Sequence, residues 1–151
     1  MNDESATIVV GSDHAGFEMK EFVKNYLSEK GYLYIDIGAP QEDPSDDYPV
    51  FAFKLAKTVS TNKYKRGILM CGTGIGASIA ANRIKGVRAA LCTSPEMAKM
   101  ARAHNDSNVL VIGGRTTEKE TAGRIIDAWL NGKFEGGRHQ KRISLLDTDH
   151  I

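Results

Sequence analysis

The sequence predicts an α/β fold, in which helices cover both faces of one doubly wound, five-stranded parallel sheet, a Rossmann-like three-layer sandwich. Short apolar segments alternate with segments of helical periodicity along the chain. The length of 151 residues fits one domain, and many of the 15 glycines follow the apolar segments, where a strand turns into a helix. We therefore expect a single domain over residues 1–151, of which 132–151 form a basic C-terminal tail.

Five segments are predicted to be strands because they are short, apolar and bounded by turn residues. They are Ile8–Gly11, Tyr32–Ile37, Gly67–Cys71, Val87–Cys92 and Val109–Ile112. From the general habits of such folds we expect the strand order 2-1-3-4-5 with right-handed crossovers. The functional crevice should then lie at the carboxyl ends of the strands, near the switch between strands 1 and 3.

Helices are predicted between these strands. The first should follow Gly16, because its apolar residues recur at the spacing of one helical face, and Gly31 should end it. Pro49 suits the first turn of the second helix. A helix of small residues should follow the glycine-rich segment after Cys71.

The last two helices carry clear start signals. Ser94 is a good cap before Pro95, which opens a helix that should run to about His104. Residues 117–120, Thr-Glu-Lys-Glu, fit a capping box, and the apolar residues between 122 and 130 repeat one helical face.

Composition excludes several classes of protein. The 20 Lys and Arg against 19 Asp and Glu leave a net charge of +1, which does not support nucleic-acid binding through the whole surface. Two cysteines make no disulfide framework and favour a reducing compartment. The N-terminus lacks the pattern of a signal peptide, and no apolar run is long enough for a membrane helix. We expect a cytoplasmic protein with no membrane partner.

The most informative segment is Cys71–Ser78, which follows the third strand. Alternating glycines let backbone amides point into one concavity, as an anion or an oxyanion requires. The dinucleotide fingerprint is matched only loosely, and a tight turn without chemistry is the alternative. A helix N-terminus favours the thiolate of Cys71, although a lone cysteine is often a small buried apolar residue. Cys92 has no such loop and is interpreted as structural.

Other strand ends supply further candidates. Gly11–Gly16 has the spacing of a phosphate loop, but Phe17 replaces the lysine, which argues against a nucleoside triphosphatase. Taken alone, the Asp13–His14 pair favours an ordinary surface histidine, and a packed core histidine is the alternative for His104. We expect one group of side chains at the carboxyl ends of the strands: Asp13, His14, Cys71, Thr73, His104 and Arg115.

No metal site is predicted, because no HxxH, HxxxH or CxxC spacing occurs. Arg138, Lys141 and Arg142 form a short basic run in the tail. The run lacks the interleaved aromatic residues of a nucleic-acid site, so it is either an ordinary solvated face or a grip for one phosphate.

Five motifs occur in order along the chain: GSDHAGF, DYP, CGTGIGASIAANR, RAHNDSNVLVIGGR and FEGGRHQKRI. Together they resemble type B ribose-5-phosphate isomerase, whose wider family includes allose-6-phosphate and galactose-6-phosphate isomerases, and the resemblance runs from about Ile8 to Ile143. It implies interconversion of ribose 5-phosphate and ribulose 5-phosphate through an enediolate, with no metal or cofactor, in the non-oxidative branch of the pentose phosphate pathway.

The resemblance also implies roles for individual residues. Cys71 is expected to take the C2 proton, Thr73 to serve the reacting oxygens, His104 to open the furanose ring and Asp13 to lie beside the sugar hydroxyls. The anion hole would be formed by the amides of Gly72, Thr73, Gly74, Ile75 and Gly76. The phosphate grip is expected from His14, Arg115, Arg138 and Arg142, and sugar contacts from Tyr48, Asn105 and, less surely matched, His139.

In the family the two tail arginines come from the neighbouring subunit, so a homodimer, or a dimer of dimers, with shared sites is expected. The same chemistry on a six-carbon phosphate is the nearest alternative. A non-catalytic module that binds sugar phosphates or nucleotides is the alternative from another class; it would keep the glycine loop without needing Cys71, Thr73 and His104 together.

Overall fold

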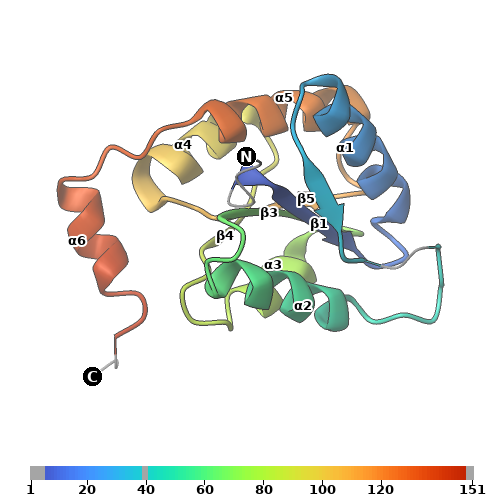
Figure 1. Ribbon diagram of the computed structural model, residues 1–151, viewed down its shortest axis with the longest axis horizontal. Helices are drawn as coiled ribbons and strands as arrows, with labels where there is room; N and C mark the ends of the chain where they lie inside the picture. The colour runs from blue at the N-terminus through green and yellow to red at the C-terminus, as the bar shows by residue number, and fades with distance from the viewer. Residues whose placement is uncertain (1–5, 39–40, 149–151) are drawn as a thin grey trace.

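Five parallel strands form one sheet between two layers of helices in the computed structural model, which describes residues 6–38 and 41–148 (Figure 1). The predicted α/β class is confirmed, and residues 1–5, 39–40 and 149–151 of the expected domain lie outside the described part. The strands are β1 (Ile8–Ser12), β2 (Tyr34–Asp36), β3 (Arg66–Cys71), β4 (Ala89–Leu91) and β5 (Val109–Gly113). The helices are α1 (Phe17–Glu29), α2 (Tyr48–Ser60), α3 (Ile75–Ala81), α4 (Pro95–Asn105), α5 (Lys119–Asn131) and α6 (Arg138–Ser144).

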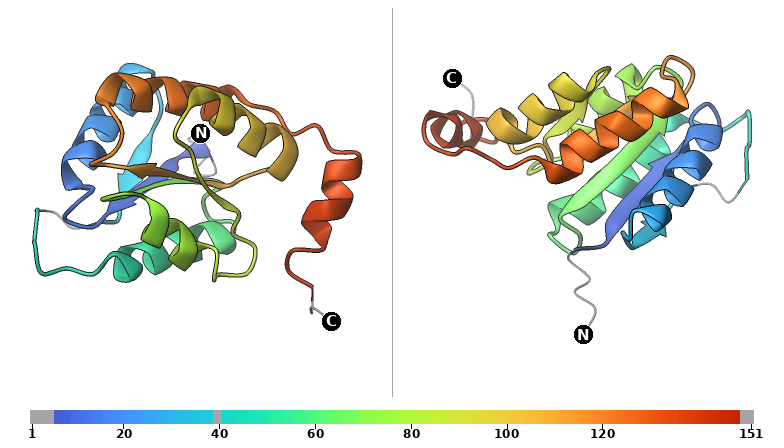
Figure 2. Two further views of the ribbon diagram at one scale, coloured as in Figure 1. Left: turned by 180° about the vertical axis from the view of Figure 1, so that it is seen from behind. Right: turned by 90° about the horizontal axis from the view of Figure 1, so that it is seen from above.

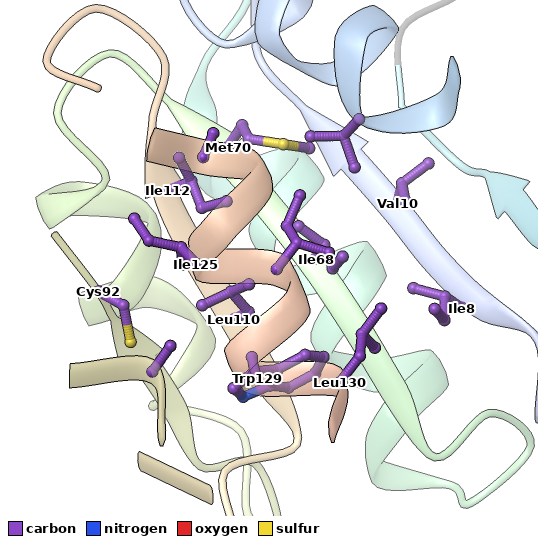
Figure 3. Packing of buried hydrophobic residues seen from close by; sticks show 14 of the residues in the cluster. Ile8, Val10, Ile68, Met70, Cys92, Leu110, Ile112, Ile125, Trp129 and Leu130 are labelled. Atoms are coloured by element: carbon purple, nitrogen blue, oxygen red, sulfur yellow. The ribbon is translucent and has the colours of Figure 1, made fainter. Parts of the chain in front are cut away.

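The sheet buries both of its faces, because side chains alternate along each strand. One face, with Ile68 and Leu110, packs against α1, α4 and α5, and the other, with Leu69 and Val111, packs against α2 and α3. Figure 3 shows Trp129 and its neighbours on α5 lying over β3 and β5. The burial of β1, β3 and β5 on both faces explains their continuous apolar sequences.

The strand order is β2-β1-β3-β5-β4, so the expected order 2-1-3-4-5 is wrong in its last two positions. Every residue of β5 is buried, and β5 pairs with β3 over five residues. The Ala89–Leu91 strand has three residues, all only partly buried, which suits the edge of the sheet. A long, wholly apolar strand belongs inside the sheet, and this criterion predicts the observed order better than chain order does.

Helix starts follow the sequence signals in one case and not in another. Ser94 caps α4, and its hydroxyl accepts a hydrogen bond from the amide of Met97 at 3.2 Å. The capping box expected at residues 117–120 is wrong, because α5 begins at Lys119 and its N-cap, Glu118, makes no side-chain cap bond.

The basic tail also contains a helix that the sequence did not predict, α6, which stands beside α4 and apart from the layers (Figures 1 and 2).

The five parallel strands all end along one side of the sheet, the carboxyl edge, and all begin along the opposite side, the amino edge. These two sides differ from the outer strands β2 and β4, which bound the sheet laterally. Loops that leave the strands, after Ser12, Cys71 and Gly113, lie at the carboxyl edge. The helices return to the opposite, amino edge, so the end of α4 lies next to the start of β5. Trp129 on α5 holds the turn between α4 and β5 in place, because its Nε1 donates a 2.6 Å hydrogen bond to the hydroxyl of Ser107 in that turn.

Gly16, between β1 and α1, allows the two elements to meet β3 closely. A Cβ at Gly16 would lie 2.6 Å from the carbonyl carbon of Met70, which belongs to the rigid interior of the sheet. Gly16→Ala should therefore lower the free energy of unfolding by about 1–3 kcal/mol in urea denaturation. Gly11→Ala is the matched control, because its Cβ would make ordinary contacts of 3.5 and 3.6 Å. Equal losses in the two variants would contradict this account of Gly16.

Candidate active site

Cys71 is the last residue of β3 and faces the glycine loop that follows it. Its side chain is buried, and the sulfur accepts a hydrogen bond from the amide of Gly74 at 3.2 Å. Gly74 is held at φ 82°, and a Cβ there would lie 2.5 Å from Leu91, so the turn requires glycine. Thr73 presents its hydroxyl in the same loop, where the oxygen accepts from the amide of Ile75 at 3.2 Å.

Arg115 lies against this loop because β5 and β3 end side by side. The amide of Gly114 donates to the carbonyl of Cys71 at 2.7 Å, and the amide of Arg115 donates to that of Gly72 at 2.9 Å. A Cβ at Gly72 would lie 3.7 Å from Nη1 of Arg115, so the guanidinium is beside the glycine loop. The same arginine, with His14, lines a pocket of ≈ 430 Å³. A cation therefore lies beside the glycine loop and lines a pocket next to it, as the binding of a phosphorylated ligand requires.

Tyr48, at the start of α2, covers the other side of the loop. A Cβ at Gly76 would lie 2.6 Å from the Cζ of Tyr48, so the aromatic ring packs directly on this glycine. Tyr48 as a whole is 41% exposed. The predicted sugar contact thus lies next to the predicted anion hole.

Asp13 and His14 follow the end of β1, and each takes part in a hydrogen bond to a carboxylate oxygen. Asp13 is buried and accepts from the amide of Gly16 at 3.0 Å. His14 Nδ1 lies 2.6 Å from Asp46 Oδ1, and the backbone amide of His14 donates to the same oxygen at 3.0 Å. The hydrogen bond to Asp46 raises the pKa of His14 above 6.5, and Asp13 adds to the rise against partial burial and Arg115. The imidazolium form, which can pair with a phosphate, is thereby favoured.

A second group of predicted residues lies around the end of α4 and on α6. A pocket of ≈ 250 Å³ is lined by His104, Asn105, His139 and Arg142 together with two apolar residues, one on α6 and one just after it. The rings of His104 and His139 stack with centroids 4.3 Å apart. Partial burial, then the charges of His104 and Arg138, lower the pKa of His139. The second group thus combines two imidazoles, an amide and two guanidinium groups.

The end of α4 is held in place by a charged turn. Arg102 donates to the carbonyl of Ser107 at 2.6 Å and to Asp106 Oδ1 at 2.9 Å. Arg88, just before β4, donates to the carbonyl of Asn105 at 3.1 Å. The backbone that carries the second group is therefore fixed to the amino edge of the sheet.

The two groups lie at opposite edges of the sheet, so the expectation that His104 joins Cys71 at the carboxyl ends of one chain's strands is wrong. His104 belongs to α4, which ends before β5 begins, whereas Cys71 and Arg115 lie where β3 and β5 end. The five residues of β5 span about 16 Å at about 3.3 Å each, more than one histidine side chain bridges. The sequence placed His104 correctly on a helix, but the direction of that helix carries it away from the strand ends.

The model of the ribose/galactose isomerase family matches residues 8–146. The chain belongs to this family. Ribose-5-phosphate isomerase B of Escherichia coli is 44% identical over 139 residues, which cover 92% of this chain and 93% of that protein. A solved ribose 5-phosphate isomerase from Thermotoga maritima is 50% identical with a TM-score of 0.91, over 94% of this chain and 97% of the other. The enzyme from Mycoplasma genitalium, solved with bound ribulose 5-phosphate, is 43% identical with a TM-score of 0.87, over 91% of each chain.

Two residues that sequence reasoning missed complete the two groups in this family member. Asp46 bonds His14 from a loop 32 residues away, and Glu135 approaches both His104 and His139. The only local sequence signal for either residue is that Glu135 and His139 are four positions apart, the i, i+4 spacing of side chains that can meet on a helix. Each group brings three possible metal-ligand atoms within 4.8 Å of one another, Asp13, His14 and Asp46 in one and His104, Glu135 and His139 in the other.

Among the described residues, no helix has the length and apolar character needed to cross a membrane.

The bond from Asp46 should control the protonation of His14. Asp46→Asn removes the largest contribution to the raised pKa, so the pKa of His14 should fall and its imidazolium should be lost at a lower pH. The measurement is an NMR titration of the His14 ring protons. Asp47→Asn is the matched control, since it removes a neighbouring charge without touching the His14–Asp46 bond. An unchanged His14 titration in Asp46→Asn would contradict the assignment.

Proposed function

We propose that this chain is an aldose–ketose isomerase that interconverts D-ribose 5-phosphate and D-ribulose 5-phosphate. The observation that carries the proposal is the carboxyl-edge group, in which the sulfur of Cys71 accepts the Gly74 amide beside a threonine hydroxyl and Arg115. Relatives named for this reaction cover nearly the whole chain. The reaction belongs to the non-oxidative branch of the pentose phosphate pathway. Two unpaired cysteines support the cytoplasm as the compartment.

Proton transfer is assigned to the loop after β3. Cys71 takes the proton from C2 of the open-chain aldose, and the electron pair moves to give an enediolate. The amides of Gly72–Gly76 are assigned to the oxygen that becomes negative, which is the larger expected contribution. The amides of Gly74 and Ile75 must then turn to this oxygen from the Cys71 sulfur and the Thr73 hydroxyl. Thr73 passes a proton between O1 and O2, and the thiol returns its proton to C1 to form the ketose. Asp13, buried beside this loop, accepts from a sugar hydroxyl.

Ring opening and phosphate binding complete the reaction. The furanose form must open before C2 can lose its proton, and His104 is assigned the proton exchange at the ring oxygen. His14 and Arg115 supply positive charge at the carboxyl edge, and Arg138 and Arg142 supply it at α6. Charge-assisted bonds to the phosphate fix the substrate at a distance from the reacting carbons, so their energy serves orientation.

The separation of the two groups supports a site shared between two chains. His104 and Asn105 line one pocket with Arg142, at the edge opposite Cys71. If Arg142 acts on a neighbouring chain, as the family resemblance implies, His104 and Asn105 go with it. A two-fold axis can set the amino edge of each chain against the carboxyl edge of its partner, which makes two equivalent sites. We therefore propose a homodimer, alone or within a dimer of dimers.

Exposed apolar side chains support such a dimer. Ile75 and Ile79 on α3 are 55% and 56% exposed, and Met97 and Met100 on α4 are 45% and 49% exposed. These two helices flank the edge strand β4 in the sequence and in Figure 1. Large apolar residues gathered at one edge of a sheet are typical of a surface that another protein covers.

The alternatives differ in what they need from these groups. Allose-6-phosphate or galactose-6-phosphate isomerisation needs the same groups with room for one more carbon. A non-catalytic binding module needs the glycine loop and the cations but no proton acceptor. The hydrogen bond that polarises Cys71 and the positioned Thr73 hydroxyl favour an enzyme over a binding module.

The purified chain should convert ribose 5-phosphate to ribulose 5-phosphate in the presence of EDTA. Cys71→Ala should lower turnover by roughly 10²–10⁴-fold, because general acid–base transfer contributes about that much. Cys92→Ala is the matched control and should stay near the wild-type rate, since burial raises the pKa of Cys92 to about 11 and keeps it protonated. Activity that depends on an added divalent ion, or that survives Cys71→Ala, would refute the mechanism. Conversion of allose 6-phosphate alone would redirect the substrate assignment.

Inactive variants from opposite groups should restore activity when refolded together. Cys71→Ala with Arg142→Ala leaves one intact site in each mixed dimer, so random pairing makes about a quarter of all sites active. Cys71→Ala with His104→Asn should behave in the same way, because His104 lies with Arg142. The measurement is the specific activity of the refolded mixture.

Thr73→Ala supplies the control for that experiment. It lies in the same loop as Cys71, so a mixed dimer of Thr73→Ala and Cys71→Ala has a defect in both sites and should recover nothing. Mixed dimers of Cys71→Ala and Arg142→Ala that form without regaining activity would show that both residues serve one chain's site.

A further inference from the structure

Two histidines and one carboxylate converge where the end of α4 meets the segment before α6. The Nε2 atoms of His104 and His139 lie 3.7 and 3.6 Å from the same oxygen, Oε2 of Glu135. The imidazole rings stack with an angle of 11° between their planes. The two separations exceed the 2.7–3.2 Å of a typical N–H···O hydrogen bond. The three ligand atoms therefore lie within 4.8 Å of one another without bonding closely.

The backbone holds this convergence in place. The amide of Glu135 donates to the carbonyl of Ala103 at 3.0 Å, which fixes the segment before α6 to the last turn of α4. His139 is buried at the start of α6, and its amide donates to the carbonyl of Gly136 at 3.1 Å. An ion bound between the three side chains would find them already close to one another.

The separations match the ligand sphere of a small transition-metal ion. Zinc binds imidazole nitrogen and carboxylate oxygen at about 2.0–2.2 Å, so two ligand atoms of a tetrahedral site are about 3.3 Å apart. The observed 3.6 and 3.7 Å need a closure of a few tenths of an ångström, and the stacked imidazoles must turn so that both in-plane Nε2 lone pairs meet the ion. Two histidines and one carboxylate are also an established donor set for zinc, with the fourth position left to water.

We propose that His104, Glu135 and His139 bind a zinc-class divalent ion and that the bound ion inhibits the isomerase. The metal takes the Nε2 lone pair of His104, which then cannot exchange a proton with the sugar ring oxygen. This consequence rests on the proposed function, whereas the binding site does not. The reaction itself needs no metal in this account, so the site is a point of inhibition.

The surroundings select among cations. Arg142 lines the same pocket. Its positive charge opposes a hard ion such as Mg²⁺, which prefers oxygen ligands and would have a single carboxylate here. Imidazole nitrogen binds Zn²⁺, Co²⁺ and Ni²⁺ well enough to offset that repulsion. The site should therefore discriminate strongly against Mg²⁺.

Zinc binding is measured by calorimetry on the metal-free full chain in a Cys71→Ala background, which removes the active-site thiol as a competing ligand. Glu135→Gln, an exposed and isosteric change, and His139→Gln should each weaken binding by more than about tenfold, since even outer-shell changes at metal sites cost 10–100-fold. Asp46→Asn is the matched control from the other histidine–carboxylate group and should leave zinc affinity unchanged.

Three results of this titration would overturn the site: no zinc binding, unchanged affinity in Glu135→Gln and in a folded His139→Gln, or equally tight binding of Mg²⁺. The titration measures binding and not turnover. Failure of the chain to isomerise ribose 5-phosphate would therefore overturn the proposed function without affecting the zinc site.

Inhibition is measured separately, with Cys71 present. Zinc should slow ribose 5-phosphate turnover, EDTA should restore it, and Glu135→Gln should need more than about tenfold more zinc for half inhibition. Undiminished turnover at zinc concentrations that fill the calorimetric site would overturn the inhibitory role.

Discussion

The common direction of the five strands is the constraint on which the rest of the structure depends. Every strand of a parallel sheet delivers its following loop to one edge, and every crossover helix returns the chain to the other. The central strands, β1, β3 and β5, are buried on both faces, so neither edge can be shifted without unfolding the core. The chemistry of the chain is therefore distributed between two edges about 16 Å apart. Asp13, Cys71 and Arg115 belong to one edge and His104 to the other.

Close packing at the carboxyl edge explains why glycine recurs there. At Gly16, Gly74 and Gly76, a Cβ would meet the backbone or side chain of another element at less than 3 Å. Three loops thus approach one another closely enough for backbone amides, a thiol and a guanidinium group to face the same region. The local rigidity that holds Cys71 against the Gly74 amide is a product of this packing rather than of the short α3 alone.

Much of the fold was predictable from local patterns, because buried strands and amphipathic helices carry their periodicity in the sequence. The residues at strand ends, such as Cys71 and Arg115, could be placed for the same reason. The order of β4 and β5 was missed because it depends on relative burial, and Ala89–Leu91 is too short to reveal an edge position by itself. Asp46 and Glu135 were missed because their partners are brought to them by tertiary structure or by an unpredicted helix. Predicting that His104 lies at the amino edge requires the direction in which α4 runs across the sheet, and the spacing of residues does not encode that direction.

The family assignment gives one reaction, and the structure separates the candidate catalytic residues of this chain into two groups. One group holds Cys71 and the glycine loop, and the other holds the stacked histidines and the arginines of α6. The central claim is that a working site takes one group from each of two chains. A crystal structure of this protein with ribulose 5-phosphate tests it most directly. The account predicts that the sugar contacts Cys71 of one chain and His104 and Arg142 of another, and a sugar whose contacts all come from a single chain would contradict it.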